Sequence, residues 1–542
     1  MIEDWEECIL GEVLVKMCNG SSAKQFNEEV GYPISRIETI WNETIDLNRV
    51  KYVMENDVDF VEKYKLRKND ILLSHINSDA HLGKTAIIKS ERYTLIHGIN
   101  ILLLRPSSLL IAEFLLYQLR FLKVKGAFID VASRSVNQSS VNQQKLNKFK
   151  ITLFPLPIQR AIVTKLEELF SDLDSGIDDL KKAQAQLKIY RQAVLKKAFE
   201  GEFTKEWRAQ QTDLPTAEEL LEQIKEERLK HYEQKLEGWK NAVEIWEENG
   251  KEGKKPRKPQ AIKKLEDMKV LSNIGLLEIP ECWCYLQSEY LSDFITKETT
   301  PKSSELSQDN GDIPFVKVYN LTFTGELDFR INPTFVSNDI HSNFLNRSIT
   351  LPNDILMNIV GPPLGKVSIV PETYPEWNIN QAIVRFRPYP SIISKYLANF
   401  LMMKWTIHQV SKKAKATAGQ FNLTLEICRE IFVPVCSLKE QHQIVREIES
   451  RLSVCDNVEQ SIAESLEKAK ALRQSILKKA FEGKLLTAAE IAKCKQEKDY
   501  EPASVLLAKI AQSRAEEQEK IKAEKALQKA KSKKGKMTKK AK

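Results

Sequence analysis

The sequence predicts an α/β (α+β) protein in which two α/β domains are separated by two long antiparallel coiled-coil helices, with a pseudo-twofold internal duplication. The hexapeptide Lys-Lys-Ala-Phe-Glu-Gly occurs at 196–201 and again at 478–483, an offset of 478 − 196 = 282. The same offset relates Leu82-Gly83-Lys84 to Leu364-Gly365-Lys366. A repeat of about 280 residues is too long for a solenoid, so it indicates a duplicated module with two similar working ends.

The first part of each copy has the pattern of a mixed α/β domain. Short apolar runs at 71–73, 85–88 and 99–104 are separated by Gly, Asn and Asp, which predicts strands. The helical spacing of apolar residues over 109–122 then predicts a helix. The second copy repeats this order, with strands expected at 354–357, 367–370 and 382–386 and a single helix at 394–410.

The second part of each copy is predicted to be a long helix. Apolar residues alternate at spacings of three and four over about five heptads, which indicates a coiled-coil seam. The helices are expected to end at Gly201 and Gly483. Two such helices at matched positions of a duplicated chain are best explained as partners of each other. The expected seam residues are Ile162, Leu166, Phe170, Leu173, Ile177, Leu180, Leu187 and Val194, with Ile444, Ile448, Leu452, Cys455, Val458, Ile462, Ala469 and Ile476.

The third part of each copy carries an apolar stripe on an otherwise charged helix. Such a stripe must either fold back or dock on another chain, and we predict partner-binding residues there. Residues 249–264 are rich in Gly, Lys and Pro and predict a flexible linker. Residues 525–542 contain nine lysines and no acid, which is typical of a solvated tail. The predicted partner-binding residues are Leu220, Leu221 and Ile224 and their counterparts Leu506, Leu507 and Ile510.

Composition narrows the class of protein. The chain of 542 residues is long enough for three or four domains, and its net charge of +8 allows a polyanionic partner. Eight cysteines have neither zinc nor disulfide spacing, which predicts a reducing, cytoplasmic environment. The acidic N-terminus does not resemble a signal peptide, and the apolar stretch 109–122 is too short and too polar to span a bilayer.

The motifs that would indicate catalysis are incomplete. Gly83-Lys84-Thr85 resembles the end of a phosphate-binding loop, but position 78 is serine where the first glycine is needed. Asn332-Pro333-Thr334-Phe335 lacks the second proline of the amino-methyltransferase motif. The seven histidines are dispersed, and no metal-binding spacing or nucleophile–base pair is evident. We therefore expect no catalytic residue and no metal site in this chain.

A polar, basic stretch that recurs at the same offset is the candidate for binding DNA. Arg, Asn, Gln and Lys are the side chains that recognise base edges, while Ser, Thr and Lys commonly contact phosphate. An ordinary solvated loop is the alternative, and recurrence in both copies favours function over it. The candidates are Arg36, Lys84, Arg134, Asn137, Gln138 and Asn142 in the first copy, and Lys317, Lys366, Lys415, Gln420 and Asn422 in the second.

These features together resemble the specificity (S) subunit of type I restriction-modification enzymes. The motifs that carry the resemblance are Asn69-Asp70-Ile71-Leu72, Leu82-Gly83-Lys84, the Gln-x-x-Ile-Val opening of each long helix at 159–163 and 441–445, the hexapeptide at 196–201, and Phe203-Thr204 with Trp207-Arg208. The resemblance covers essentially residues 5–490. The first helix departs from the family, because Ile158 stands where Glu is usual; Glu440 keeps the family residue in the second helix.

The resemblance implies that the two α/β domains are target recognition domains, each reading one half of a split DNA target, with the paired helices fixing the gap between the halves. Methylation and cleavage would belong to partner subunits, two methyltransferase (M) subunits and restriction (R) subunits, which bring S-adenosylmethionine, ATP and Mg²⁺. The competing hypothesis is a coiled-coil scaffold that binds proteins at both ends. The expected segments are recognition domain 1 at 1–155, helix 1 at 156–204, a charged partner-contact segment at 205–275, recognition domain 2 at 276–437, helix 2 at 438–486 and a C-terminal helical segment with a lysine-rich tail at 487–542.

Overall fold

The chain forms two compact units, which are described separately. The computed structural model describes residues 3–54, 57–135, 138–262, 275–297, 299–308, 311–361, 363–417, 420–516 and 519. Unit 1 consists of Met1–Lys181 and Ala463–Lys542, and unit 2 consists of Lys182–Ile462. The long helices α6 (Leu156–Phe199) and α13 (Leu438–Phe481) each contribute a part to both units. The segments predicted from the sequence therefore differ from these units, because the end of the chain packs with its beginning.

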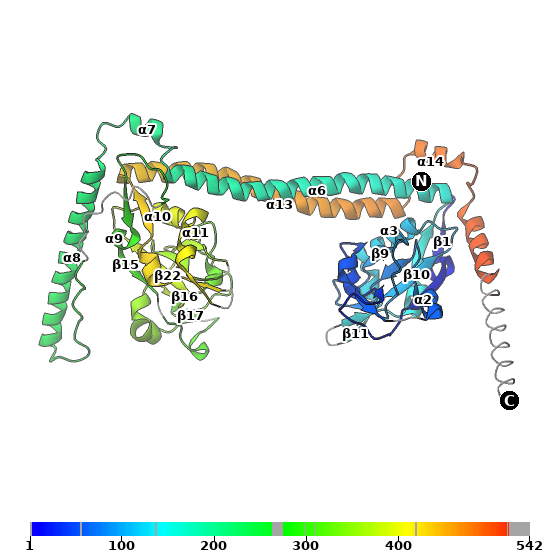
Figure 1. Ribbon diagram of the computed structural model, residues 1–542, viewed down its shortest axis with the longest axis horizontal. Helices are drawn as coiled ribbons and strands as arrows, with labels where there is room; N and C mark the ends of the chain where they lie inside the picture. The colour runs from blue at the N-terminus through cyan, green and yellow to red at the C-terminus, as the bar shows by residue number, and fades with distance from the viewer. Residues whose placement is uncertain are drawn as a thin grey trace. The chain divides into compact units, whose positions relative to one another are not determined.

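Unit 1 is organised around a four-stranded antiparallel sheet in the order β2-β10-β7-β9. Strands β9 and β10 of this sheet are labelled in Figure 1. Its central strands are apolar on both faces. Ile71 and Leu73 of β7 (Ile71–Leu73) belong to the core that includes helix α3 (Ala112–Val124), whereas Leu72 belongs to a second cluster on the opposite face. This is the alternation that a strand imposes, and a sheet covered on both faces needs apolar residues at every position.

The remaining elements of unit 1 are short. They are β1 (Glu6–Ile9), α1 (Leu10–Val13), β2 (Leu14–Asn19), β3 (Tyr32–Ile34), η1 (Ile37–Thr39), β4 (Ile40–Trp41), β5 (Thr44–Ile45), η2 (Leu47–Arg49), β6 (Lys51–Val53), α2 (Val58–Tyr64), β8 (Ile76–Asn77), β9 (Thr85–Ile87), β10 (Leu102–Pro106), α4 (Ala127–Asp130), β11 (Ser133–Ser135), β12 (Gln138–Ser140), α5 (Gln143–Asn147), β13 (Lys150–Leu153) and α14 (Ala488–Lys495). Residues 503–516 are also helical. Strand β1 pairs with β13, immediately before α6 begins.

Unit 2 repeats this architecture, with a sheet in the order β15-β22-β18-β20. Its elements are α7 (Lys205–Ala209), α8 (Ala217–Glu248), β14 (Cys284–Gln287), α9 (Ser288–Leu291), β15 (Ser292–Thr296), η3 (Ser303–Glu305), β16 (Ile313–Val316), η4 (Val318–Asn320), β17 (Phe335–Val336), η5 (Ile340–Phe344), η6 (Asn346–Ser348), β18 (Ile355–Asn358), β19 (Val360–Gly361), β20 (Val367–Ile369), β21 (Asn378–Ile379), β22 (Ile383–Pro388), α10 (Ser394–Leu401), α11 (Lys404–Lys413), β23 (Lys415–Thr417), β24 (Gln420–Asn422), α12 (Leu425–Arg429) and β25 (Phe432–Val435). The equivalent order of strands confirms that the duplication extends to topology.

One helix expected in the second copy is divided into two shorter helices. The sequence predicts a single helix at 394–410, but α10 ends at Leu401 and α11 begins at Lys404. Met403 between them has an extended backbone (φ −64°, ψ 132°), and the Thr406 hydroxyl donates to the Phe400 carbonyl over 2.8 Å. Because Leu401 and Met403 are both buried, the tertiary core stabilises a break that no Gly or Pro marks in the sequence.

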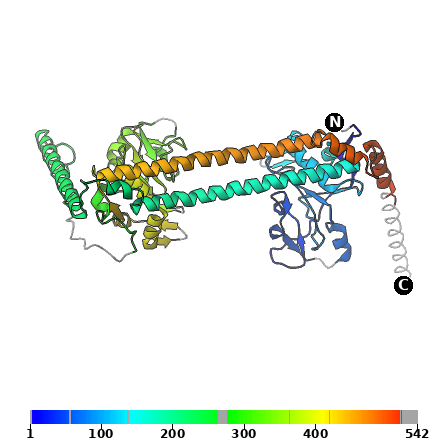
Figure 2. The same cartoon turned by 90° about the horizontal axis from the view of Figure 1, so that it is seen from above.

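In each unit, the parts of α6 and α13 that belong to it run side by side in opposite directions (Figure 2). In unit 1, Arg473 pairs with Asp174 and lies over the Phe170 ring at 4.5 Å. In unit 2, Arg191 pairs with Asp456 at 2.6 Å. The predicted seam is unevenly buried. Its buried residues are Ile162, Leu166, Phe170, Val194, Ile444, Ile448, Cys455, Ile462, Ala469 and Ile476; Leu173, Ile177, Leu180, Leu187 and Leu452 are half-buried, and Val458 is 41% exposed.

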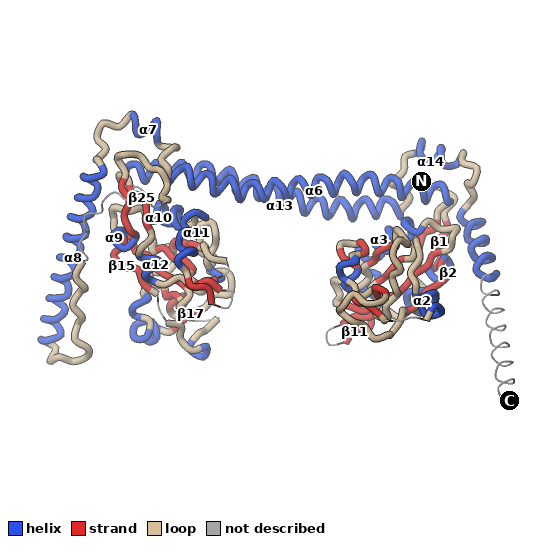
Figure 3. The backbone as a smooth tube through the Cα atoms, viewed as in Figure 1, coloured by secondary structure: helices blue, strands red, loops and turns tan. Residues whose placement is uncertain are grey.

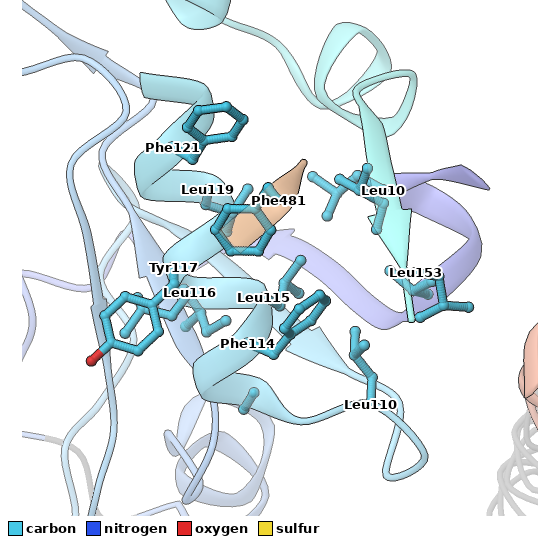
Figure 4. Packing of buried hydrophobic residues seen from close by; sticks show 14 of the residues in the cluster. Leu10, Leu110, Phe114, Leu115, Leu116, Tyr117, Leu119, Phe121, Leu153 and Phe481 are labelled. Carbon is cyan, nitrogen blue, oxygen red and sulfur yellow. The ribbon is translucent and has the colours of Figure 1, made fainter. Parts of the chain in front are cut away.

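The phenylalanine of each repeated hexapeptide anchors a helix end in a domain core. Phe481, at the end of α13, lies 5.5 Å from the Phe114 ring and 5.6 Å from the Phe121 ring of α3 (Figure 4). Phe199, at the end of α6, contacts Tyr396 and Phe400 of α10 in the same way. Gly201 and Gly483 follow with φ +70°, the left-handed conformation that ends a helix and favours glycine. The hexapeptide is therefore a packing motif.

The predicted partner-binding stripes fold back onto their own unit. Leu220 and Ile224 are buried in unit 2, and Leu506 and Ile510 are buried in unit 1, while Leu221 and Leu507 pack partly buried against the same cores. Of the two alternatives that the sequence leaves open, the structure shows intramolecular packing. A role of these six residues in binding a partner subunit stays a prediction, since no partner chain is present in the structure.

The predicted flexible linker after α8 also packs within its own unit. Residues 249–262, which we call the basic strap, run back along α8 (Figure 3). The Trp239 indole N–H donates to the Pro256 carbonyl over 3.0 Å, and that of Trp246 donates to the Gly253 carbonyl over 3.4 Å. Two tryptophans on one helix face thus hold a segment whose composition alone suggested flexibility. Among the helices that the structure describes, none is both long and apolar enough to cross a membrane.

Candidate nucleic-acid interface

A tight turn at the end of the central sheet contains the repeated Gly-Lys pair. In unit 1 this turn connects β7 to β9, and the Gly83 N–H donates to the Ser74 carbonyl over 2.8 Å. Gly83 has φ +75°, and a Cβ atom there would lie 2.7 Å from the Phe128 ring. Gly365 has φ +94° and would meet Ile407 at 3.0 Å. Backbone conformation and close packing both require glycine at this turn, so the pair is a structural element that presents Lys84 and Lys366.

The polar stretch beside this turn is a β-hairpin in both units. Strands β11 and β12 pair, and β12 also pairs with β8 in the turn region. In unit 2, β23 pairs with β24, which pairs with β19. We call these the recognition hairpins. Their tips, which include the candidate Asn137, lie outside the described residues. A hairpin fixed on a third strand is better ordered than a free loop, so its side chains are presented in a defined register.

Exposure differs among the candidates of unit 1. The Arg134 side chain is 67% exposed, with its guanidinium 3.7 Å from the Asp79 carboxylate, and Gln138 is also exposed. Asn142 instead caps helix α5, because its side chain accepts from the Lys145 N–H over 2.8 Å. Arg36 pairs with Glu38 at 3.1 Å. Arg134 and Gln138 are thus placed on the hairpin itself, whereas Asn142 has a structural role that accounts for its residue type.

Lys84 lies close to a second cation. Burial and the neighbouring Lys84 lower the pKa of Lys123 from its ordinary value. The Glu43 carboxylate acts in the opposite direction and raises the pKa of Lys123, so an anionic side chain of the chain itself already lies near this lysine.

Two candidates of unit 2, Lys317 and Lys366, lie near exposed aromatic rings. The Lys366 ammonium donates to the Val318 carbonyl over 3.4 Å and lies 6.0 Å from the Phe323 ring, and the Lys317 ammonium lies 6.0 Å from the Tyr319 ring. Asn422 is exposed on β24. Lys415 lies in strand β23 and Gln420 in strand β24 of the recognition hairpin. Their side chains lie outside the described part of the structure.

Sequence reasoning missed an exposed aromatic residue that lies next to a cation at the same place in each unit. Trp41, 45% exposed, follows the short helix η1, and the Arg49 guanidinium lies 3.7 Å from its ring centre. Phe323, 55% exposed, occupies the corresponding turn after η4. An aromatic residue at the same position of both copies is the sequence signal that could have identified them. A single exposed aromatic residue would not have been enough, because such residues are common on protein surfaces.

The motif Asn-Asp-Ile-Leu proves to be structural. Asn69 and Asn353 both have φ +70°. The buried Asp70 carboxylate accepts two hydrogen bonds from Arg105 of β10, at 2.6 and 2.7 Å, and Asp354 accepts two from Arg387 of β22, at 2.8 and 2.7 Å. A bidentate pair of this kind is both strong and directional, so it fixes neighbouring strands below the turn.

The glutamine at the start of each long helix has the same kind of role. Buried Gln159 accepts from the Ile111 N–H over 3.1 Å and donates to the Phe154 carbonyl over 2.7 Å. Gln441 accepts from the Ile393 N–H over 2.9 Å and donates to the Cys436 carbonyl over 3.0 Å. Each amide joins the start of the long helix to the start of the helix that covers the sheet. The Asn-Asp-Ile-Leu motif and the glutamine that opens each long helix therefore hold the elements around the candidate interface in place and are not part of it.

Within the residues that the structure describes, no group of three or more His, Cys, Asp or Glu side chains is arranged to hold a metal ion. All eight cysteines are free thiols. The chemistry that the interface offers is therefore hydrogen bonding, charge and aromatic contact.

Comparison with known proteins agrees with this architecture. The chain is 40% identical over 198 residues to the MjaX type I restriction enzyme specificity subunit of Methanocaldococcus jannaschii, covering 36% of this chain and 46% of that protein. It is 29% identical over 346 residues to the EcoBI specificity subunit of Escherichia coli, covering 62% of this chain and 58% of that protein. These alignments thus span about half of each relative's length.

A solved structure of a type I R-M system has the same fold, with a TM-score of 0.59 and 17% identity over 89% of this chain and 98% of that one. The family model for the type I restriction modification DNA specificity domain matches residues 2–182 and again residues 288–468. These two matches cover more than half of the chain and coincide with its two copies. The chain therefore belongs to the type I restriction modification DNA specificity domain family.

Proposed function

We propose that this chain is the non-catalytic, cytoplasmic specificity subunit of a type I restriction-modification complex and binds DNA in a sequence-specific way. The observation that carries the proposal is the recurrence of a recognition hairpin beside a Gly-Lys turn in both units. Arg134 and Gln138 present the donors and acceptors that recognise base edges in the major groove. Lys84 and Lys366 supply positive charge for the adjacent phosphates.

Each recognition domain would bind one half of a bipartite target, and the helix pair α6 and α13 would set the gap between the halves. Methylation and cleavage would reside in separate M and R subunits, with two M subunits per specificity subunit. Those partners would supply S-adenosylmethionine, ATP and Mg²⁺, and the assembled complex would act as a site-specific deoxyribonuclease and adenine methyltransferase. This division of labour rests on family membership and on the incomplete catalytic motifs of the sequence.

The test is to express the chain with its M subunits and map methylated adenines across the host genome. The proposal predicts one motif made of two different half-sites separated by a fixed number of unspecified bases. An M-subunit preparation without this chain is the control, and it should give no motif. A contiguous motif, or methylation without sequence preference, would contradict the proposal. The scaffold alternative predicts no salt-dependent preference for any duplex.

A further inference from the structure

The basic strap combines tight anchoring with unpaired charge. Its prolines, Pro256 and Pro259, are half-buried against α8, and most of its other residues are exposed. Holding a segment in one conformation costs roughly 1–2 kcal/mol per residue in backbone entropy. A connector that only links two elements does not need this order, so the two tryptophan hydrogen bonds indicate that the conformation of the strap matters.

Five cations and a single acid, Glu252, occupy positions 251–258 of the strap. All five cations are exposed, and three of them lie over the anchoring rings: the Lys251 and Lys255 ammonium groups are 5.9 and 5.7 Å from the Trp246 ring, and that of Lys258 is 5.8 Å from the Trp239 ring. The five cations are Lys251, Lys254, Lys255, Arg257 and Lys258.

Within the described part of the chain, these charges form no ion pairs. The outer half of α8 carries five glutamates, Glu233, Glu237, Glu244, Glu247 and Glu248, yet no ion pair joins any of the five cations to a carboxylate among the residues described here. Elsewhere on α8 such pairs do form, as between Lys225 and Glu222 at 3.1 Å. The strap therefore presents a compact positive surface to solvent, and the aromatic contacts orient it without cancelling its charge.

In the sequence, the second copy of the repeat also ends with an apolar helical stripe that is followed by a basic segment. Leu506, Leu507 and Ile510 follow Leu220, Leu221 and Ile224 at an offset of 506 − 220 = 286. The helix that carries them leads to the lysine-rich segment 525–542, which lies outside the described residues. A basic segment thus follows the equivalent helix in both copies, which favours a shared role over an accident of one linker.

We propose that the basic strap binds the phosphates of duplex DNA independently of sequence, outside the half-site that the recognition hairpin of unit 2 contacts. The proposal rests on the proposed function, since it assumes that the protein works on DNA. Duplex DNA carries regularly spaced phosphates, which can contact several cations along one protein segment. Binding also releases the counterions that are condensed on the DNA. Because the strap is already ordered, little further conformational entropy is lost on binding.

The test is the salt dependence of binding to a random-sequence 60-bp duplex, measured with the full-length chain in its complex. The variant K251Q/K254Q/K255Q/R257Q/K258Q removes the five charges. Each phosphate contact contributes about 0.9 to the slope of log K against log salt, so the slope should fall by up to about 4 and the affinity at moderate salt at least tenfold. The methylated motif should stay the same, because the recognition hairpins are unchanged.

The matched control is E237Q/E244Q/E247Q/E248Q, which removes four charges of the opposite sign from α8, the helix along which the strap runs, and should not lower the slope. A second variant, W239A/W246A, keeps every cation but releases the strap. It should weaken binding while leaving the slope near that of the parent. Thermal unfolding of each variant shows whether the unit remains folded.

An unchanged slope in the five-site variant would overturn the proposal. Loss of M-subunit association with an unchanged slope would overturn it in favour of an acidic protein surface. Failure of the proposed function is recognised separately, because the parent complex would then show no motif. The difference in slope between the parent and the five-site variant, measured on the random-sequence duplex, reports on the strap.

Discussion

The two units differ in a buried site at the start of the long helix, although the duplication makes their folds alike. In unit 2, Glu440 is buried and its carboxylate accepts hydrogen bonds from Thr204 at 2.7 Å, Arg208 at 2.5 Å and the Trp283 indole at 2.9 Å. In unit 1 the counterparts of Glu440 and Thr204, at the offset of 282, are Ile158 and Leu486, both buried in the apolar core.

This difference shows that several residues of one site changed together. A single replacement of Glu440 would leave three donors without an acceptor, and a single carboxylate at position 158 would face Leu486 without a partner. A buried ion pair and an apolar contact of similar volume are comparable in stability, whereas a half-exchanged site is costly. The two copies therefore fill the same buried site in two different ways, with a hydrogen-bonded carboxylate in unit 2 and with apolar side chains in unit 1.

Other features remain equal in both units. Arg191 pairs with Asp456, and at the same offset Arg473 pairs with Asp174, so the cross-helix ion pair is duplicated. The strand-locking pairs of Asp70 with Arg105 and Asp354 with Arg387 are duplicated as well. Features that orient the long helices and the sheet are kept, while the surroundings of the helix start have diverged.

The largest effect is expected from exchanging only part of the divergent site. Glu440→Ile should destabilise unit 2 by roughly 3–5 kcal/mol, because Arg208, Thr204 and Trp283 lose their acceptor. Adding Thr204→Leu should recover part of this loss, since the pair then resembles Ile158 and Leu486 of unit 1. Denaturant unfolding of the full chain measures both values. Equal stability of the single and double variants would show that the site is not coupled.

The strand-locking pairs should give effects of equal size in the two units. Asp70→Asn and Asp354→Asn each remove a buried charge from a bidentate pair, and we expect a loss of about 2–4 kcal/mol in the affected unit. Hydrogen exchange of β7 and β18 reports on each unit separately. A large loss in one unit with none in the other would break the equivalence that the geometry indicates.

The units should differ in their response to acid. Burial lowers the pKa of His75 and of His97 in unit 1 to about 4, whereas the equivalent positions of unit 2 are the buried Ile359 and Ile379. In the unfolded chain both histidines titrate near 6.5. Their contribution is therefore complete above pH 6.5 and is lost as the pH falls towards 4, by linkage at most roughly 3 kcal/mol for each histidine.

Exchange protection of β10 in unit 1 should accordingly fall faster between pH 7 and pH 5 than that of β22 in unit 2, after correction for intrinsic exchange rates. Equal losses in both strands would contradict the assignment of the acid sensitivity to His75 and His97.

The smallest effect on stability, and the most selective one on function, is expected at the recognition hairpins. Replacing Arg134 and Gln138 with Ala should weaken specific binding by roughly 1–3 kcal/mol for each base that is no longer recognised, with little change in unfolding free energy. Lys415→Ala with Gln420→Ala should do the same for the other half-site. Titration of duplexes mutated in one half-site at a time, at fixed salt, measures the result. Unchanged affinity would make the hairpins simple connections.

Much of the fold follows from local patterns in the sequence. The apolar runs at 71–73 and 85–88 become β7 and β9, and the 3/4 spacing becomes helices α6 and α13 of 44 residues each. The hexapeptide marks the helix ends because glycine is needed in a left-handed conformation there. These features depend on neighbours in sequence, which is why the pattern alone predicts them.

The parts that sequence reasoning missed depend on residues far apart in the chain. Glu440 meets Arg208 and Trp283 only in the folded unit, and the basic strap is ordered by Trp239 and Trp246, which its own composition does not reveal. The apolar stripe at Leu220 and Ile224 has the same pattern whether it binds a partner or its own core. At the candidate interface, the polar stretch was predicted, but its hairpin geometry and the exposed Trp41 and Phe323 required the strand pairing.

The central claim is that each unit recognises one half of a DNA target independently. The most direct measurement replaces residues 1–152 with the corresponding segment of another family member and maps methylated sites in cells that contain the partner subunits. The donor segment should keep an aromatic residue at the position of Phe114, so that Phe481 still packs in the core. The account predicts that one half-site changes while the other half-site and the spacer length stay the same. A change in both half-sites, or in neither, would contradict it.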